Sequence, residues 1–323
     1  MSDGDYPASL SGADDMAKMK QLCSFDYRGQ ACWYLNAFWP SVGEKAEQFW
    51  EYVEKASKID NAGKAGTGLD ELEAHRFLEA FNDVHTVLEM RSKLRSTGAI
   101  AQNERPKTVP LIHYLLFTYE KDWKTLVTAA QGDNSEEIAE AQAKLEAVQA
   151  AYDEVNFRLA EAQAREAEAK EAEAPFKAAC EELEAARKAV QEQEDAYNAK
   201  TESLKAASET GGVVSRNKAK VSLDAHLAED PLPLRKAKLT LAAAQKKADK
   251  ARAPFQAKTD AAAAARAQVE VALQDAADRM KEAEDFLQAA KEKPGCAHGS
   301  LWWIDRQLQE KKKYMPVSKG GLR

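Results

Sequence analysis

The chain has 323 residues, a formal net charge of −7 and 31% charged side chains. This length allows two or three structural units, and the net acidity argues against a nucleic-acid partner. No apolar run reaches the roughly 18 residues that a membrane span needs, and the opening stretch MSDGDYPASLSGADD lacks the apolar core of a secretory signal. The four cysteines are widely spaced without a CxxC pair, which indicates reduced thiols. We therefore expect a cytoplasmic protein that contacts no membrane.

The first part of the chain is rich in aromatic residues. We expect residues 1–20 to form a flexible lead-in and residues 21–131 to form a compact domain. Apolar residues recur there at helical spacing, as in Leu72, Phe77, Phe81 and Leu88, and no strand-like alternation competes with this pattern. The sequence therefore predicts a helical domain of roughly 110 residues.

Two segments of this domain have the outline of EF-hands, KIDNAGKAGTGLDELEAHRFLEAF and GAIAQNERPKTVPLIHYLLFTY. A calcium loop needs oxygen ligands at positions 1, 3, 5 and 12 and a glycine at position 6. A first loop that starts at Asp60 has Ala62 and Lys64 at positions 3 and 5. A second loop that ends at His113 has Pro106 at position 5 and histidine at position 12. We expect an EF-hand-like domain that binds neither calcium nor any other metal or cofactor.

Residues 135–208 follow a heptad pattern. Counted from Ile138, the d positions stay apolar for ten heptads, from Ala141 through Val148 and Val155 to Leu204, with charged residues between them. A sustained 3.5-residue period predicts a coiled coil. Gly211-Gly212 predicts a chain reversal, and a second heptad run continues from Leu234 to Phe286. We expect an antiparallel helical hairpin over residues 135–293, with its turn near 209–214, and a C-terminal latch and basic tail over 294–323.

A short repeated motif supports the hairpin. EAPFKA contains Pro175, and RAPFQA contains Pro254. Each proline removes a backbone donor and should kink its helix. If the chain folds back at the glycines, the two kinks lie within a few residues of each other. Chance repetition in an alanine-rich sequence is the alternative interpretation.

The charges of the hairpin are unevenly distributed. Residues 136–173 hold 11 acidic and 4 basic side chains, whereas residues 235–258 hold 8 basic side chains and Asp249. Pairing between the helices is one interpretation, and a binding surface for an acidic polymer is the other. The candidate filament-binding residues are six of this run and three of the tail: Arg235, Lys236, Lys238, Lys246, Lys247, Lys250, Lys311, Lys312 and Lys313.

No catalytic site is evident in the sequence. The chain lacks GxGxxG, GxxxxGK[ST], HExxH and GxSxG motifs, and its five histidines are isolated. Cys296 and His298 offer two metal ligands without a third or fourth nearby. We expect a protein that is not an enzyme.

Three segments, ACWYLNAFWPSVGEKAEQFW, PLIHYLLFTYEKDW and GSLWWIDRQLQEKKKY, resemble the calcium-regulated actin-bundling proteins of amoeboid cells. The ending WW-x-x-R-x-L-x-E-K-K-K matches at Trp302, Trp303, Arg306, Leu308, Glu310, Lys311, Lys312 and Lys313. The resemblance implies an EF-hand-type domain, long helices and bundling of actin filaments. It also implies inhibition by calcium, which the degenerate loops contradict.

The tail presents large apolar residues at helical spacing. Leu301, Trp302, Trp303, Ile304 and Leu308 predict a short helix that needs an apolar surface. We interpret Trp302, Trp303 and Leu308 as a latch that docks on the aromatic domain, and we expect the three lysines beyond it to be exposed. Insertion of the tryptophans into a partner filament is the alternative.

Together these features predict an all-α, non-enzymatic cytoskeletal protein that binds and cross-links or braces filaments. The partner implied by the resemblance is F-actin. The alternative is a structural component of a microtubule assembly such as a flagellar axonemal doublet, bound to the tubulin lattice and to other assembly proteins. The degenerate calcium loops and the long helices, which could follow a lattice, keep this alternative open. A coiled-coil scaffold for signalling partners has no support beyond the heptads.

Overall fold

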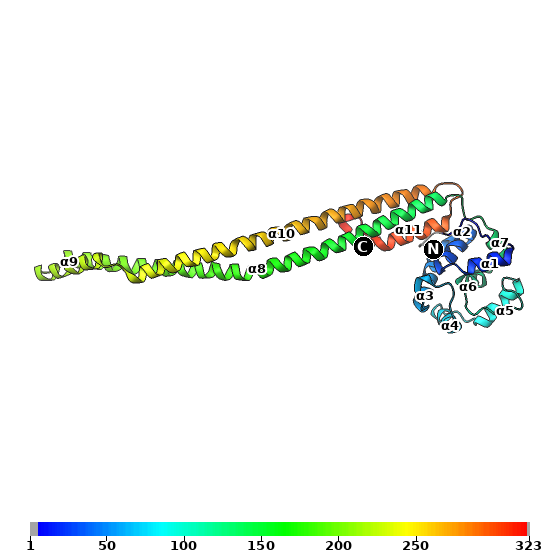
Figure 1. Cartoon of the computed structure of the whole chain (residues 1–323), viewed down its shortest axis with the longest axis horizontal. Coiled ribbons are helices and arrows are strands. Elements are labelled where there is room, and N and C mark those ends of the chain that lie inside the picture. The colour runs from blue at the N-terminus through cyan, green and yellow to red at the C-terminus, as the bar shows by residue number, and fades with distance from the viewer. Residues whose placement is uncertain (1–5, 322–323) are drawn as a thin grey trace. The chain divides into compact units, whose positions relative to one another are not determined.

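The computed structural model describes residues 6–321, whose regular secondary structure is helical apart from one isolated β-bridge (Figure 1). The chain divides into two compact units. The head unit comprises the residues up to 153 together with those from 273 onward, and the hairpin unit comprises residues 154–272. Within residues 6–321, no helix combines the length and the apolarity that a bilayer span requires.

The N-terminal part of the head unit is built from short helices, whose ends match local sequence signals. Asp14 and Asp26 cap the helices that follow them, Asp70 and Thr86 each form a capping box with a glutamate, and Gly98 (φ +80°) ends a helix. The helices are α1 (Asp15–Cys23), α2 (Tyr27–Val42), η1 (Gly43–Lys45), α3 (Ala46–Ile59), η2 (Gly63–Ala65), α4 (Glu71–Ala80), α5 (Val87–Thr97), α6 (Leu111–Tyr119) and α7 (Trp123–Thr128).

The structure corrects the expectation of a flexible lead-in over residues 1–20, of which residues 1–5 lie outside the described part. Helix α1 begins at Asp15, and Leu10 and Met19 are buried in the domain core. The Tyr6 hydroxyl donates a hydrogen bond to Asp26 at 2.6 Å. In the described part of this stretch, Tyr6, Leu10, Met16 and Met19 pack in or against the core, which is too few to produce a periodic pattern in the sequence.

Two helix–loop–helix segments, α3–α4 and α5–α6, pair through their loops. Leu69 and Val109 exchange both backbone hydrogen bonds, at 3.0 and 2.7 Å, and each lies two residues before the next helix. This two-fold pairing places the two residues at equivalent positions of their loops. Since Val109 is position 8 of a loop over 102–113, Leu69 is position 8 of a loop over 62–73. The predicted frame starting at Asp60 is therefore two residues too early.

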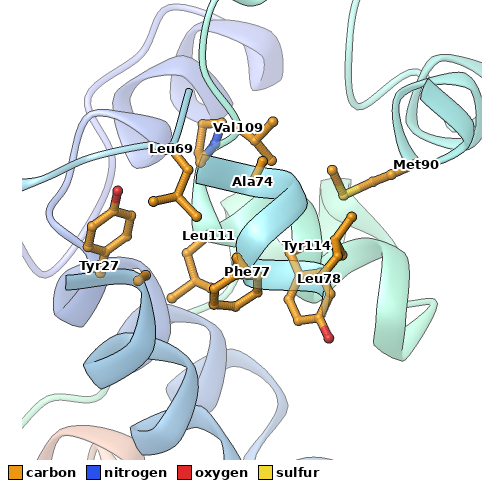
Figure 2. Close-up of a pocket in the computed structure, with 11 residues that line it drawn as sticks. Tyr27, Leu69, Ala74, Phe77, Leu78, Met90, Val109, Leu111 and Tyr114 are labelled. Atoms are coloured by element: carbon orange, nitrogen blue, oxygen red, sulfur yellow. The ribbon is translucent and has the colours of Figure 1, made fainter. Parts of the chain in front are cut away.

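The interior between these paired segments is tightly packed. Figure 2 shows Leu69, Phe77, Leu78, Met90 and Tyr114 around an apolar cavity. The space left inside it for water is only about 10 Å³, which is at most enough for a single water molecule. The domain therefore holds no open groove at this place.

The predicted antiparallel hairpin is confirmed. It consists of α8 (Ser135–Glu209), α9 (Val213–Ala228) and α10 (Leu232–Lys291), with the reversal at Gly211 and Gly212. The d positions of α8 are buried or half-buried throughout, as the heptads predict. The rings of Phe176 and Phe255 stack at 5.0 Å, so Pro175 and Pro254 lie at the same level of the hairpin. Two final helices, α11 (His298–Lys312) and η3 (Val317–Lys319), follow.

Candidate filament-binding surface and docked C-terminal helix

Half of the basic candidates on α10 are already paired within the hairpin unit. Arg235 contacts Asp230 at 2.8 Å, Lys238 contacts Glu194 at 2.9 Å and Lys247 contacts Glu182 at 2.5 Å. The last two pairs join α10 to α8. These side chains therefore contribute to pairing between the helices, which was the first of the two interpretations of the charge pattern.

The other three candidates, Lys236, Lys246 and Lys250, are exposed and form no ion pair within residues 6–321. At 100° per residue their spacings of ten and four residues place them within about 80° of one another on the helix. Ala244 and Ala248, centred about 140° around α10 from the middle of this row, are buried. We call Lys236, Lys246 and Lys250 the outer lysines. They form a row of uncompensated positive charge that faces away from α8.

The outer lysines alternate with exposed leucines that the sequence analysis did not single out. Leu232 and Leu239 lie four residues before and three residues after Lys236, and they are 56% and 66% exposed. The positions 232, 236, 239, 243, 246 and 250 repeat with heptad spacing on the face opposite to the buried one. A second heptad register, offset from the first, is the sequence signal that would have identified this surface.

One side of α11 completes the core of the aromatic domain. Trp303 is only 2% exposed, and its ring centroid lies 5.0 Å from that of Trp50 on α3. Trp302 is half-buried and packs edge-on against Trp303 at 6.0 Å. The Arg306 guanidinium lies over the Trp50 ring, 4.8 Å from its centroid, and forms an ion pair with Glu47 at 2.8 Å. Both tryptophans thus lie against the domain.

The other side of α11 packs against the first turns of α8 and the last turns of α10 (Figure 1). Leu308 belongs to this second cluster. It was expected to dock on the aromatic core, but it is not among the residues of that core. The cluster contains residues from all three helices: Ala141, Leu145, Val148, Tyr152, Met280, Ala283, Leu287, Ala290, Leu301, Ile304 and Leu308. Helix α11 is therefore shared between two apolar clusters of the head unit.

The start of α11 is held by residues distant in the sequence. Asn36 on α2 accepts a hydrogen bond from the Ser300 backbone N–H at 3.0 Å, and Asn134 accepts one from the Ala297 N–H at 2.9 Å. A side chain at Gly299 would bring a Cβ atom within 2.5 Å of the Leu35 Cβ, so α2 and α11 can approach this closely only with glycine there. No local pattern could reveal these contacts, because the partners are more than 160 residues apart.

The tail lysines are less free than the sequence suggested. Lys311 donates a hydrogen bond to Gln149, Lys312 contacts Glu284 at 2.5 Å and Lys313 contacts Glu310 at 2.7 Å. Only Lys313 is exposed, whereas Lys311 and Lys312 are half-buried. The expectation that all three are exposed is therefore wrong for two of them, because α8 and α10 pass beside this end of α11.

The loops of the paired segments lack the side chains that a calcium ion requires. In the frame given by the β-bridge, positions 1, 3 and 5 of the first loop are Ala62, Lys64 and Gly66. The carboxylate of Glu73 at position 12 accepts a hydrogen bond from the backbone N–H of Asp70 at 2.9 Å. In the second loop, position 12 is His113, which is buried beside Cys23. The residues present do not fit a calcium site.

Comparisons with known proteins give two further findings. A family model described as "F actin bundling C terminal" matches residues 109–293, which is more than half of the chain. A similar solved structure is the crystal structure of the 34 kDa F-actin bundling protein from Dictyostelium discoideum, with 20% sequence identity, a TM-score of 0.42, and coverage of 94% of this chain and 97% of that chain. No curated protein matches the chain in sequence.

Proposed function

The chain belongs to the F-actin bundling C-terminal family, and we propose that it is a non-enzymatic protein of the cytoskeleton that binds and cross-links actin filaments. Family membership is the observation that carries this proposal. The charge pattern of α10 supports it, because a row of cations without intramolecular partners attracts an acidic polymer surface. No finding favours the microtubule alternative, which becomes one arm of the test.

The outer lysines, Lys236, Lys246 and Lys250, are the proposed contact with the filament. Among the six candidates on α10, they are the three that can meet filament carboxylates without first breaking an ion pair. Arg235, Lys238 and Lys247 would exchange one carboxylate partner for another, so they would gain less from binding. We expect their contribution to affinity to be smaller.

Binding is expected to be indifferent to calcium. The family resemblance implies inhibition by this ion, but the ligand positions of both loops carry residues such as Ala62, Lys64, Pro106 and His113. None of these side chains offers an oxygen ligand to a hard cation.

The direct test is co-sedimentation of the purified chain with F-actin and, in parallel, with stabilised microtubules, each with calcium or with a chelator. We expect pelleting with F-actin alone, equal in both calcium conditions and weaker at high ionic strength because exposed charges are screened. Replacement of the three outer lysines by glutamate should lower the affinity by about tenfold or more.

The matched control reverses three exposed lysines of α8, Lys177, Lys188 and Lys205, and changes the net charge by the same amount. Equal losses in both triple variants would mean that net charge, and not the outer face of α10, governs binding. Pelleting with microtubules alone would reassign the protein to the other filament.

A further inference from the structure

Each long helix of the hairpin unit carries a second, exposed heptad stripe. On α10 it is the outward row already described, which contains Leu232, Leu239 and the outer lysines. On α8, exposed residues repeat with the same alternation of four and three positions: Ala178, Glu182, Ala185, Ala189, Glu192 and Ala196. A heptad stripe marks the side of a helix that packs against another helix. The first stripes form the seam of the hairpin, so the second stripes predict one further partner helix each.

Both second stripes lie on the same broad side of the hairpin. Lys247 on α10 contacts Glu182 on α8 at 2.5 Å. Around α10, Lys247 lies only about 20° from the outer lysine Lys236. This ion pair therefore joins the edge of one stripe to a member of the other. We call the surface formed by the two stripes the hairpin face.

The two halves of the hairpin face are complementary in charge. The contacts of Lys238 with Glu194 and of Lys247 with Glu182 show that residues 235–250 of α10 run beside residues 181–195 of α8. The α10 segment holds six basic side chains and one acidic one, whereas the α8 segment holds six acidic and two basic ones. Glu181 and Glu192 are exposed and form no ion pair among the described residues.

The two halves also differ in the size of their apolar side chains. Leu232 and Leu239 project from α10 with 56% and 66% of their surface exposed. The α8 stripe presents alanines at the same levels of the hairpin, Ala196 and Ala189. A row of alanines leaves room for leucine side chains from a closely packed helix.

We propose that a second copy of this chain covers the hairpin face, so that two hairpin units form a four-helix bundle whose twofold axis runs parallel to the helices. This symmetry places the α10 stripe of each copy on the α8 stripe of the other at the same level. Lys236 then meets Glu192 of the second copy, and Lys246 and Lys250 meet its Glu181. A twofold axis across the helices would instead stack α8 on α8 and α10 on α10, which brings like charges together.

The inference goes beyond the proposed function, because this dimer uses the outer lysines that are the proposed contact with the filament. Dimer and filament therefore compete for the same side chains. The dimer is a resting form of the chain, and an acidic filament surface replaces the second copy.

The test measures the mass of the purified full chain without actin. Sedimentation equilibrium between about 1 and 100 µM gives the dissociation constant of the dimer. One variant reverses the α10 half of the face, Lys236→Glu plus Lys246→Glu plus Lys250→Glu, and another reverses the α8 half, Glu181→Lys plus Glu192→Lys. Circular dichroism verifies that each variant keeps its helices.

The matched control for the α8 variant is Glu184→Lys plus Glu202→Lys. It makes the same change of charge at exposed positions without an ion pair among residues 6–321. These positions are turned about 60–80° around α8 from Glu181 and Glu192, away from the hairpin face.

We expect the unmodified chain and the control to approach twice the mass of one chain as the concentration rises. Each of the two face variants should dimerise about tenfold or more weakly. An equal mixture of these two variants should associate again, because each contact between them joins opposite charges. An unmodified chain that keeps the mass of one copy at about 100 µM, or a mixture that associates no better than its components, would overturn the proposal. Neither result affects the proposed function, since no filament is present.

Discussion

His113 replaces the glutamate that a calcium loop carries at position 12, and its surroundings keep it uncharged. The side chain is 6% exposed, and its Nε2 lies 3.6 Å from the Cys23 Sγ. Burial, helped by the positive charge of Arg91, lowers the pKa of His113 to about 4. Burial raises the pKa of the Cys23 thiol to about 12. Two neutral groups therefore join α6 to α1, in a place where a cation could not be held.

This neutral pair predicts that the head unit is sensitive to acid. The pKa of His113 lies below its ordinary value of 6.5, so the unfolded chain binds the proton more readily than the folded chain. Stability is therefore fully present above pH 6.5 and is lost as the pH falls toward 4. Between pH 7 and pH 5 the loss should be about 2 kcal/mol. Urea unfolding followed by tryptophan fluorescence measures it in this unit, because all six tryptophans lie there.

The variant His113→Leu serves as the control, since it keeps the site apolar and removes the titrating group. Its unfolding free energy should change little between pH 7 and pH 5. His75 and His85 are exposed and remain in both proteins. An equal acid sensitivity of the unmodified chain and of His113→Leu would show that other groups are responsible.

At the scale of a helix, α11 is the element with the most distant partners. It fills the aromatic core with Trp303 and the neighbouring cluster with Leu301, Ile304 and Leu308. A 15-residue helix has little stability alone in water, so its formation depends on these two apolar surfaces. The predicted latch therefore packs into two apolar clusters of the head unit and not into the aromatic core alone. Its contribution to stability can be tested.

We predict that the double variant Trp302→Ala plus Trp303→Ala lowers the melting temperature of the head unit. The loss should come mainly from Trp303, because replacing a buried tryptophan by alanine costs about 3–5 kcal/mol. Near-ultraviolet circular dichroism during heating gives the measurement. Trp302→Ala alone is the control and should cost less, since Trp302 is half-buried. Unchanged melting of the double variant would contradict the docking of α11.

For the whole molecule, cross-linking of filaments requires two filament contacts, whereas the outer lysines are a single proposed contact. The tail lysines Lys311, Lys312 and Lys313 are the remaining basic candidates, but each has a partner within the head unit. Low-speed pelleting of F-actin reports bundles, and high-speed pelleting reports binding. Comparing the two separates the role of the tail from that of α10.

We expect replacement of all three tail lysines by alanine to leave both kinds of pelleting unchanged. It should lower the stability of the head unit by less than about 2 kcal/mol, because partly exposed ion pairs contribute little each. The charge reversal of the outer lysines should weaken both kinds of pelleting and serves as the comparison. Loss of low-speed pelleting alone in the tail variant would identify the tail as the second filament contact.

Much of the architecture follows from local patterns in the sequence. Heptad periodicity predicts the long helices, because a helix that repeats apolar residues every 3.5 positions must bury that stripe. Gly211-Gly212 predicts the reversal, and the repeated proline motifs predict which levels of the hairpin meet, as the stacking of Phe176 on Phe255 confirms. These features depend on neighbours within a few turns, so the sequence is sufficient to identify them.

Other features were decided only by tertiary structure, because they depend on partners far away in the chain. The β-bridge from Leu69 to Val109 sets the frame of the first loop, and packing beside α8 and α10 engages Lys311 and Lys312. Composition alone cannot separate the free outer lysines from their paired neighbours, since all belong to one basic run. The sequence determined that this chain is helical with a long antiparallel hairpin, and the fold determined which of its basic side chains have no ion-pair partner among residues 6–321, because pairing depends on residues that only the folded chain brings together.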